Sequence, residues 1–411
     1  MIRLLSLLAL ASATAVAAGQ GPTEFTIIGG KHDVTNVVVA IPLSEKAEIT
    51  RLNLPDGGKQ RPAQVVSTGL LADGKTKYAL MTVLPKVAAG ETVVLSVPKA
   101  IQLYKESKFK FVEEEGKHVD LLVNDRKVLR YMNAKRDGTT KDTHELTFKP
   151  FHHVYDPIKG ETLLTNGAGL AADKNLQFPH HRGIYLGWMT IRYGANQTAD
   201  VWHGRNGEYT QHEKMLLSEA GSVVARQRAA INWHGKDGLL FAEETREVDV
   251  FMQPKGTLLE FSSILTTKLP RVTLDGDPQH AGFHFRAAME TAKKYAKETY
   301  YLRPDGKDAP GKTRNWDPKT KQGPVNLPWN AMSFKVADTR YTAVYLDHPD
   351  NPKEARYSER DYGRFGSYFV FDVTPTTPLR IKYRIYITEG EMTKDEVENL
   401  SHGFVDAPKV K

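Results

Sequence analysis

Apolar and polar residues alternate along much of the chain. In residues 380–387 every second side chain is isoleucine or tyrosine, and segments 108–111 and 247–250 repeat the pattern. A period of two, with β-branched and aromatic residues on one face, is typical of half-buried antiparallel strands. These segments predict that the chain consists mainly of antiparallel β-sheet.

A helical pattern is convincing at one place only, near the end of the sequence. Thr393 stands where it can cap a helix over residues 394–400, ahead of His402 and Gly403. Because strand patterns dominate everywhere else, the sequence predicts an all-β protein.

The strand patterns divide into two parts. Residues 23–102 contain short strand-like runs separated by turn clusters such as Pro55-Asp56-Gly57-Gly58, with few histidines or aromatic residues. This composition predicts a small, immunoglobulin-like accessory β-sandwich. From about 105 to 405 the runs are longer and titratable residues are dense, which predicts a large antiparallel β-sandwich that carries the functional site.

The first eighteen residues have the features of a secretory signal peptide. Arg3 supplies a positive charge, residues 4–18 are apolar, and Ala15-Val16-Ala17 offers small residues for cleavage. No later stretch approaches the roughly 18 apolar residues that a membrane-spanning helix needs. The sequence therefore predicts a periplasmic or secreted protein without a membrane span.

Composition adds limits to this picture. The 411 residues include no cysteine, so the fold must be held by its apolar core rather than by disulfides, which favours a bacterial exported protein. The formal net charge is +7, with lysines scattered through loops. Such an excess serves surface solubility, or attracts an acidic glycan. No nucleic-acid-binding motif is present, so nucleic acid is not an expected partner.

Three segments gather titratable residues at the ends of predicted strands. The first is Phe178-Pro179-His180-His181-Arg182-Gly183, just before an apolar run that ends at Trp188. The second is Trp202-His203-Gly204-Arg205, and the third is Gly282-Phe283-His284-Phe285-Arg286. Because polar residues held at the mouth of a rigid apolar element often carry chemistry, we expect the three segments to form one site.

Other residues extend the candidate site. A proline-rich segment from 303 to 328 carries Trp316, and an aromatic ring on such a loop is a platform for a sugar face. Histidine serves as a general acid or base, and arginine neutralises developing negative charge. We expect four catalytic residues: His180, His181, Glu243 and Asp347. We expect eight substrate-binding residues: His153, Arg182, His203, His284, Arg286, Trp316, His348 and Arg360.

The sequence lacks the motifs of several common enzyme classes. The chain contains no Gly-x-Ser-x-Gly elbow, no P-loop and no dinucleotide fingerprint. The histidine spacings of familiar zinc sites are also absent. We therefore expect no cofactor; a divalent metal is compatible with the histidines and carboxylates but is not indicated by their spacing.

The motifs together resemble those of a known family. They are Pro179-His180-His181-Arg182-Gly183, the Gly282–Arg286 segment, Asp347-His348-Pro349-Asp350-Asn351-Pro352 and Arg360-Asp361-Tyr362-Gly363. Over roughly residues 105–405 the chain resembles a bacterial family that carries the label "methane oxygenase PmoA". The label conflicts with the sequence, since a subunit of a membrane methane monooxygenase needs several apolar spans.

The resemblance implies a carbohydrate-related role. Members of that family are similar to exported proteins of bacteria that degrade complex carbohydrates, and the large sandwich is similar to the galactose-mutarotase-like architecture. Three functions follow. The first is a glycoside hydrolase acting on an oligo- or polysaccharide. The second is a sugar lyase or epimerase using the same residues, and the third is a glycan-binding protein without catalysis.

Overall fold

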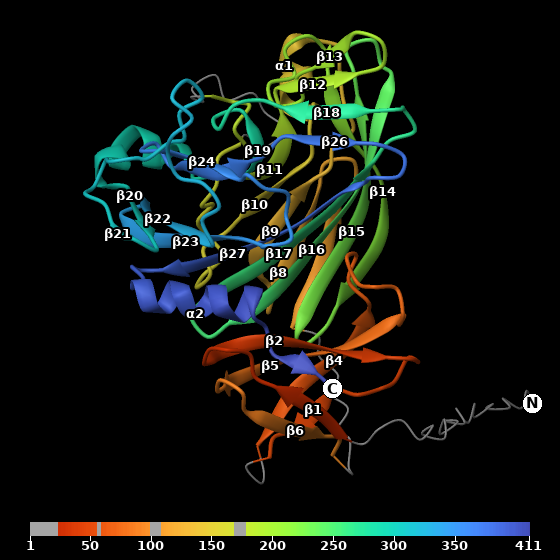
Figure 1. Cartoon of the computed structure of the whole chain (residues 1–411), viewed down its shortest axis with the longest axis vertical. Coiled ribbons are helices and arrows are strands. Elements are labelled where there is room, and N and C mark those ends of the chain that lie inside the picture. The colour runs from red at the N-terminus through yellow and green to blue at the C-terminus, as the bar shows by residue number, and fades with distance from the viewer. Residues whose placement is uncertain (1–23, 56–58, 99–107, 168–177) are drawn as a thin grey trace, which may run out of the picture.

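The computed structural model describes residues 24–411 apart from residues 56–58, 99–107 and 168–177, and the signal peptide expected at 1–18 lies outside the described part. Four antiparallel sheets account for most of this structure, which confirms the all-β prediction. The larger part of the chain is a β-sandwich, and the smaller N-terminal sheet lies at one end of it (Figure 1). Among the described residues, no helix is long and apolar enough to cross a membrane.

The N-terminal residues form a seven-stranded sheet with its own apolar core. In spatial order its strands are β2 (Val34–Leu43), β5 (Tyr78–Val87), β4 (Gln60–Ser67), β3 (Arg51–Asn53), β6 (Thr92–Ser96), β1 (Glu24–Ile28) and β28 (Lys409–Val410). The last strand comes from the other end of the chain. It pairs with β1 through Ile27 opposite Val410, so the first and last described strands lie side by side.

One layer of the large sandwich is an eight-stranded sheet. Its order is β24 (Arg356–Arg360), β25 (Arg364–Tyr368), β19 (Ala281–Arg286), β11 (Ile184–Trp188), β10 (Phe151–Val154), β9 (Arg126–Met132), β8 (His118–Val123) and β7 (Phe109–Glu114). A four-stranded sheet lies at one end of this layer, in the order β13 (Gln197–Ala199), β12 (Thr190–Tyr193), β18 (Val272–Asp275) and β26 (Phe371–Val373).

The facing layer is a nine-stranded sheet. Its order is β14 (Tyr209–Ala220), β15 (Val224–His234), β16 (Leu240–Gln253), β17 (Gly256–Thr266), β27 (Leu379–Glu389), β23 (Thr339–Asp347), β22 (Trp329–Val336), β20 (Tyr300–Arg303) and β21 (Gly306–Lys307). Aromatic rings join the two layers. Phe283 of the eight-stranded sheet stacks on Tyr383 of the nine-stranded sheet, with ring centroids 4.6 Å apart. This face-to-face packing forms the main core.

Helices are few in the described residues. They are α1 (Lys141–Thr147), α2 (Lys394–Val405), a π-helical turn over Thr291–Tyr295 and a 3-10 turn over Ala296–Glu298. Thr393 caps α2 as predicted, accepting a hydrogen bond from the backbone N–H of Glu396. The helix continues past the expected end at residue 400. Gly403 lies inside the helix and near β2, where an added Cβ would make an ordinary contact of 3.6 Å with Val37.

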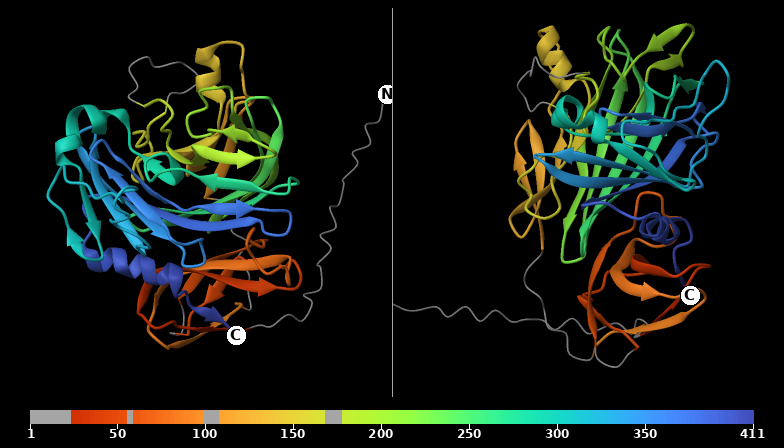
Figure 2. Two further views of the ribbon diagram at one scale, coloured as in Figure 1. Left: turned by 45° about the horizontal axis from the view of Figure 1, so that its top comes forward. Right: turned by 90° about the vertical axis from the view of Figure 1, so that its left-hand side faces the viewer.

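The α2 helix lies between the N-terminal sheet and the large sandwich (Figure 2). Its buried Val397 and Phe404 join an apolar cluster with Tyr386 of β27 and Val344 of β23. The alternation predicted in residues 380–387 is therefore confirmed, and both faces of this strand are covered. One face of β27 fills the main core, while α2 covers the other.

Candidate functional site

Strand alternation places several site residues on the outer face of the eight-stranded sheet. On β11, Ile184 and Leu186 point into the core, so Tyr185 points to the opposite face. On β19 the same rule turns His284 and Arg286 outward, and the register sets His284 directly opposite Tyr185. Gly366 of β25 lies beside His284, where an added Cβ would be 2.7 Å from Cγ of His284. The absence of a side chain at residue 366 thus makes room for the imidazole.

A tight loop before β11 adds His180 and His181. The backbone N–H of His181 donates to the carbonyl of Phe178, which closes a turn. The side-chain amide of Asn166 then donates to the carbonyl of His181 at 2.7 Å. These two bonds hold the histidine pair over the outer face of the sheet.

Five histidines meet there with an aromatic floor. Ring centroids are 4.3 Å apart for His180 and His181, 4.5 Å for His180 and His203, and 5.0 Å for His203 and His280. Trp202 touches the remaining histidine, with its centroid 4.9 Å from that of His284. We call the following residues the histidine cluster: His180, His181, Tyr185, Trp202, His203, His280 and His284.

Two histidines of the cluster are oriented by aspartates. His203 Nδ1 donates to Asp200 at 2.7 Å, and His280 Nδ1 donates to Asp277 at 3.0 Å. A carboxylate on Nδ1 fixes the ring and leaves Nε2 as the free atom. Burial raises the pKa of Asp277, but hydrogen bonding and the charge of His280 outweigh it and lower the pKa below the ordinary value. In both pairs the aspartate therefore fixes the orientation of an imidazole at the rim of the cluster.

His284 has its tautomer set by two partners. Its Nε2 donates to the carbonyl of Ala281 at 2.8 Å, and its Nδ1 accepts from the guanidinium of Arg364 at 3.0 Å. Because arginine can only donate, Nδ1 carries no proton and the ring is neutral. Burial and then the charge of Arg364 lower the pKa of His284 well below 6.5. His284 is thus a fixed wall of the site rather than a free base.

The centre of the cluster contains polar atoms without partners. Both ring nitrogens of His181 are buried and have no hydrogen bond among the described residues, although the side chain is only 2% exposed. The same holds for Nε2 of His180, the hydroxyl of Tyr185 and Nε1 of Trp202. Buried polar groups in folded proteins are nearly always bonded. Five such atoms in touching side chains therefore mark a place for a polar ligand or ordered water.

Burial sets the protonation of these groups. It lowers the pKa of His181 well below 6.5, and the charge of Arg364 lowers it further. Burial, and then the charge of Lys149, also lower the pKa of His180. In contrast, burial raises the pKa of Tyr185 well above 10. At neutral pH the centre therefore offers unprotonated imidazoles beside a protonated phenol.

Three buried cations surround the cluster. Lys149 lies 4.5 Å from the ring centroid of Tyr185 and donates to the carbonyl of Trp202. Arg286 donates to the carbonyl of Tyr362, and Arg364 donates to His284 and to the hydroxyl of Ser358. Within the described part of the chain, none of the three cations donates to a carboxylate. Burial, and then the charge of Arg182, lower the pKa of Lys149 well below 10.5, while burial lowers the pKa of Arg286 only to about 10. Uncompensated buried charge is costly, so the charged arginines favour an anionic ligand, which would also favour the protonated form of Lys149.

The structure brings five of the predicted residues together at this site. His180, His181, His203 and His284 belong to the cluster, and Arg286 lies next to it. Arg360 lies at the edge, where it donates to Asn315 and influences His284 through its charge. Residues of the three separate segments therefore lie together in the folded chain, and their joint role in one functional site stays a prediction.

Two predicted binding residues have structural partners instead. Arg182 is buried and donates to the carbonyls of Pro179 and Leu146, which ties the histidine loop to α1. His153 is buried on β10, where its Nδ1 hydrogen-bonds Thr165. In the part of the chain that the structure describes, neither side chain hydrogen-bonds to a residue of the histidine cluster.

The two predicted catalytic carboxylates lie elsewhere. Glu243 is on the nine-stranded sheet and pairs with the exposed Lys268 at 3.3 Å. Asp347 is buried at the end of β23, bonded to Asn351 at 2.6 Å and to Lys353 at 3.2 Å. Sequence alternation could not separate these positions from the site, because exposure and the choice of sheet depend on the folded topology.

His348 and Trp316 are also remote from the cluster. The ring of His348 packs on Phe404 of α2, with centroids 5.1 Å apart. Trp316 is 4% exposed and lies under the guanidinium of Arg356, 4.4 Å from its ring centroid. Its loop is held down on β24, so the tryptophan is not presented as an open platform.

Several site residues were not among the predicted ones. They are Lys149, Tyr185, Asp200, Trp202, Asp277, His280 and Arg364. A sequence signal did exist for three of them, Asp200, Asp277 and His280, together with His203. Both aspartate–histidine pairs have the spacing Asp-x-x-His, at 200–203 and at 277–280, and each forms a local turn in which the backbone N–H of the histidine returns to the aspartate.

A metal centre has no support in the observed arrangement. Among the residues that the structure describes, no three His, Cys, Asp or Glu side chains are grouped as metal ligands would be. The expectation of no cofactor, with a divalent metal compatible but not indicated, stays a prediction.

Comparison with known proteins identifies a family. The model of a family of unknown function, DUF6807, matches residues 118–402. The chain belongs to the DUF6807 family. The matched range includes every residue of the histidine cluster and leaves out β1 to β7 and β28. The resemblance to the PmoA-labelled family stays a prediction.

Two solved structures show distant similarity to this DUF6807 chain. One is a glycosyl hydrolase family 38 protein from Enterococcus faecalis, with 10% identity, a TM-score of 0.43 and coverage of 94% of this chain; the chain spans 47% of that longer protein. The other is a galactose mutarotase-like protein from Clostridium acetobutylicum, with 9% identity, a TM-score of 0.34, and coverage of 70% of this chain and 100% of the other. No curated protein sequence matches the chain.

Proposed function

We propose that the protein is a carbohydrate-active enzyme that moves protons on an acidic sugar at the histidine cluster. The observation that carries this proposal is the group of five unpartnered buried atoms on His180, His181, Tyr185 and Trp202. They offer hydrogen-bond donors and acceptors to a polar ligand, while the nearby cations favour a carboxylate on that ligand.

The arrangement suits β-elimination or epimerisation of a uronate. Neutral His181 would accept the proton from the carbon next to the sugar carboxylate. In elimination the released electron pair forms a carbon–carbon double bond as the glycosidic C–O bond breaks. The protonated hydroxyl of Tyr185 would give its proton to the departing oxygen. Arg286 and Lys149 would stabilise the negative charge that develops on the carboxylate.

Hydrolysis of a glycosidic bond has less support. That reaction commonly uses two carboxylates that flank the bond. Glu243 and Asp347 lie outside the cluster, and each aspartate that adjoins it, Asp200 and Asp277, is bonded to a histidine. Binding without catalysis is the remaining alternative.

The test uses purified protein and a panel of uronate-containing oligosaccharides. Elimination gives an unsaturated product that absorbs in the ultraviolet, whereas hydrolysis gives new reducing ends without that absorbance. We expect His181→Gln to lower turnover by roughly 10²–10⁴-fold with a nearly unchanged Tm, because the side chain makes no internal hydrogen bond.

A matched control separates chemistry from folding. His348→Gln changes a histidine that packs on α2, so turnover is expected to stay within twofold of the original. Equal losses in the two variants, or full activity of His181→Gln, would contradict the assignment. Saturable binding with no product from any acidic glycan would favour the non-catalytic alternative.

We also propose that the protein works outside the cytoplasm, in the periplasm or after secretion. The residues at 3–18 support this proposal, as does the absence of cysteine from the sequence. Cell fractionation, with N-terminal sequencing of the mature protein, tests it.

A further inference from the structure

A cavity lies between α2, β2 and the turn that joins β16 to β17. Its volume is about 430 Å³, within the range of about 300–1,000 Å³ that is usual for small-molecule sites. None of its lining residues belongs to the histidine cluster. We call this cavity the α2 groove. It therefore needs an explanation separate from the proposed catalytic site.

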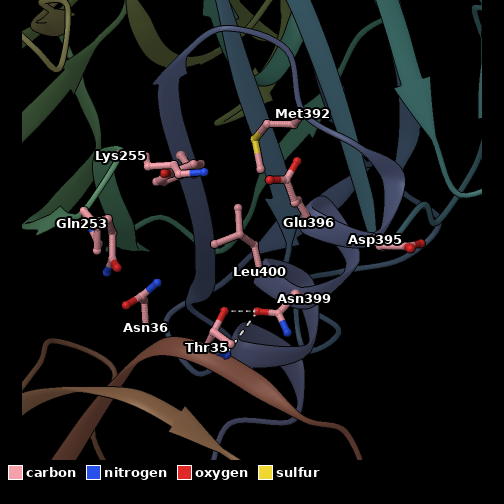
Figure 3. Close-up of a pocket in the computed structure, with 11 residues that line it drawn as sticks. Thr35, Asn36, Gln253, Lys255, Met392, Asp395, Glu396, Asn399 and Leu400 are labelled. Atoms are coloured by element: carbon pink, nitrogen blue, oxygen red, sulfur yellow. Dashed lines mark hydrogen bonds between the residues drawn. The ribbon is translucent and has the colours of Figure 1, made fainter.

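The α2 groove contains a buried amide without partners. Both polar atoms of the Gln253 side chain lack a hydrogen bond among the described residues, although the residue is only 8% exposed. Figure 3 shows Gln253 and Asn36 on one side of the groove, with Leu400 of α2 and Met392, which precedes α2, on the other. Leaving both a buried donor and a buried acceptor without a hydrogen bond destabilises the folded protein. A ligand that supplies the complementary pair would remove this cost.

The other walls narrow the chemistry of that ligand. Tyr386, Met392 and Leu400 supply apolar surface. The lining contains one positive side chain, Lys255, and two negative ones, Asp395 and Glu396. The carboxylate of Glu396 already accepts hydrogen bonds from the backbone N–H and the hydroxyl of Thr393. The groove thus differs from the cationic surroundings of the histidine cluster and does not favour a charged ligand.

We propose that the α2 groove binds a neutral saccharide unit. Adjacent sugar hydroxyls present one donor and one acceptor side by side, which is the complement of a side-chain amide. The opposite face of a sugar ring carries C–H groups, which pack on apolar side chains such as Leu400 and Met392. The groove would hold a neutral part of a glycan at a place distinct from the histidine cluster.

The test is a calorimetric titration of the full-length protein with cellobiose, maltose and xylobiose. We expect saturable binding of at least one of these sugars. Gln253→Leu should weaken it by tenfold or more, since a leucine has a similar shape but no amide. The same variant should leave the Tm of the free protein unchanged or raised, because it removes an unsatisfied buried group.

Two control variants keep the result specific. Gln227→Leu changes a glutamine that is equally buried, at 8% exposure, but lies outside the groove, and it should leave affinity within twofold. His181→Gln should also leave the affinity of the α2 groove for the sugar unchanged. A failure of the proposed catalytic function can therefore be distinguished from a failure of sugar binding in the α2 groove. Absence of binding for all three sugars, or binding that Gln253→Leu does not weaken, would overturn the proposal.

Discussion

Single residues decide what the histidine cluster can do, and burial acts on them more strongly than sequence spacing. The sequence pattern grouped His180, His181, His203 and His284 into one expected site, and the four side chains lie close together in the structure. It gave no way to exclude Glu243, because a glutamate on an alternating strand has the same local pattern in either layer. Whether a buried donor or acceptor lacks a hydrogen-bond partner depends on the packed structure. The atoms that carry the proposed function could therefore not be predicted from the sequence.

Buried histidines also make stability depend on pH. Burial, helped by Arg130, lowers the pKa of His153 to about 3 in the folded protein, against about 6.5 when unfolded. The unfolded chain therefore binds more protons at acidic pH. This stabilisation is complete above pH 6.5 and is lost as the pH falls towards 3, by about 1.4 kcal/mol per pH unit at most.

Urea unfolding at pH 7.5 and 5.5 measures this effect. We expect the free energy of unfolding to fall with acidification, and to fall by about 1 kcal/mol less in His153→Gln. Thr198→Ala, which changes an exposed residue without a titratable group, should show the same pH dependence as the original protein. Parallel losses in the original protein and His153→Gln would show that the His153 imidazole is not responsible.

At the scale of helices and strands, local sequence patterns predicted the type of each element better than its length. The cap at Thr393 and the alternation in β27 were visible because each depends on residues close in sequence. The end of α2 was not, because the last turn of the helix is held by contacts with distant parts of the chain. Phe404 is buried there in one apolar cluster with Val344 of β23 and Tyr386 of β27.

The capping box gives a prediction for α2. Thr393→Ala removes the side-chain acceptor for the N–H of Glu396 and should lower stability by about 1 kcal/mol. Thermal or urea unfolding measures it. Thr198→Ala, at an exposed position on β13, is expected to change stability by less than about 0.5 kcal/mol. If the two variants lost the same amount, the cap would not contribute.

At the scale of the whole molecule, the sequence indicated two parts but not how they are joined. Contacts between residues far apart in the chain leave no local trace. The side-chain oxygen of Gln64, for example, accepts from the backbone N–H groups of Val223 and Val224, and Glu219 accepts from Ser67. These bonds, with α2 and β28, fix the N-terminal sheet to the large sandwich.

We therefore expect the two parts to unfold together. All five tryptophans lie in the large sandwich or its loops, so their fluorescence reports that part alone, whereas far-ultraviolet circular dichroism reports both. The two melting curves should coincide. Gln64→Ala should move them apart by weakening the junction. Separate transitions in the unaltered protein would contradict this prediction.

The pairing of β28 with β1 has a consequence for the order of events during synthesis. The outer edge of β1 receives its partner only when Lys409 and Val410 have left the ribosome, long after β1 itself has emerged. Until then Thr26, Ile27 and Ile28 present unpaired backbone groups along an apolar strand, which is a template for pairing with other chains. A nascent chain that stalls short of residue 409 would need a chaperone to shield that edge.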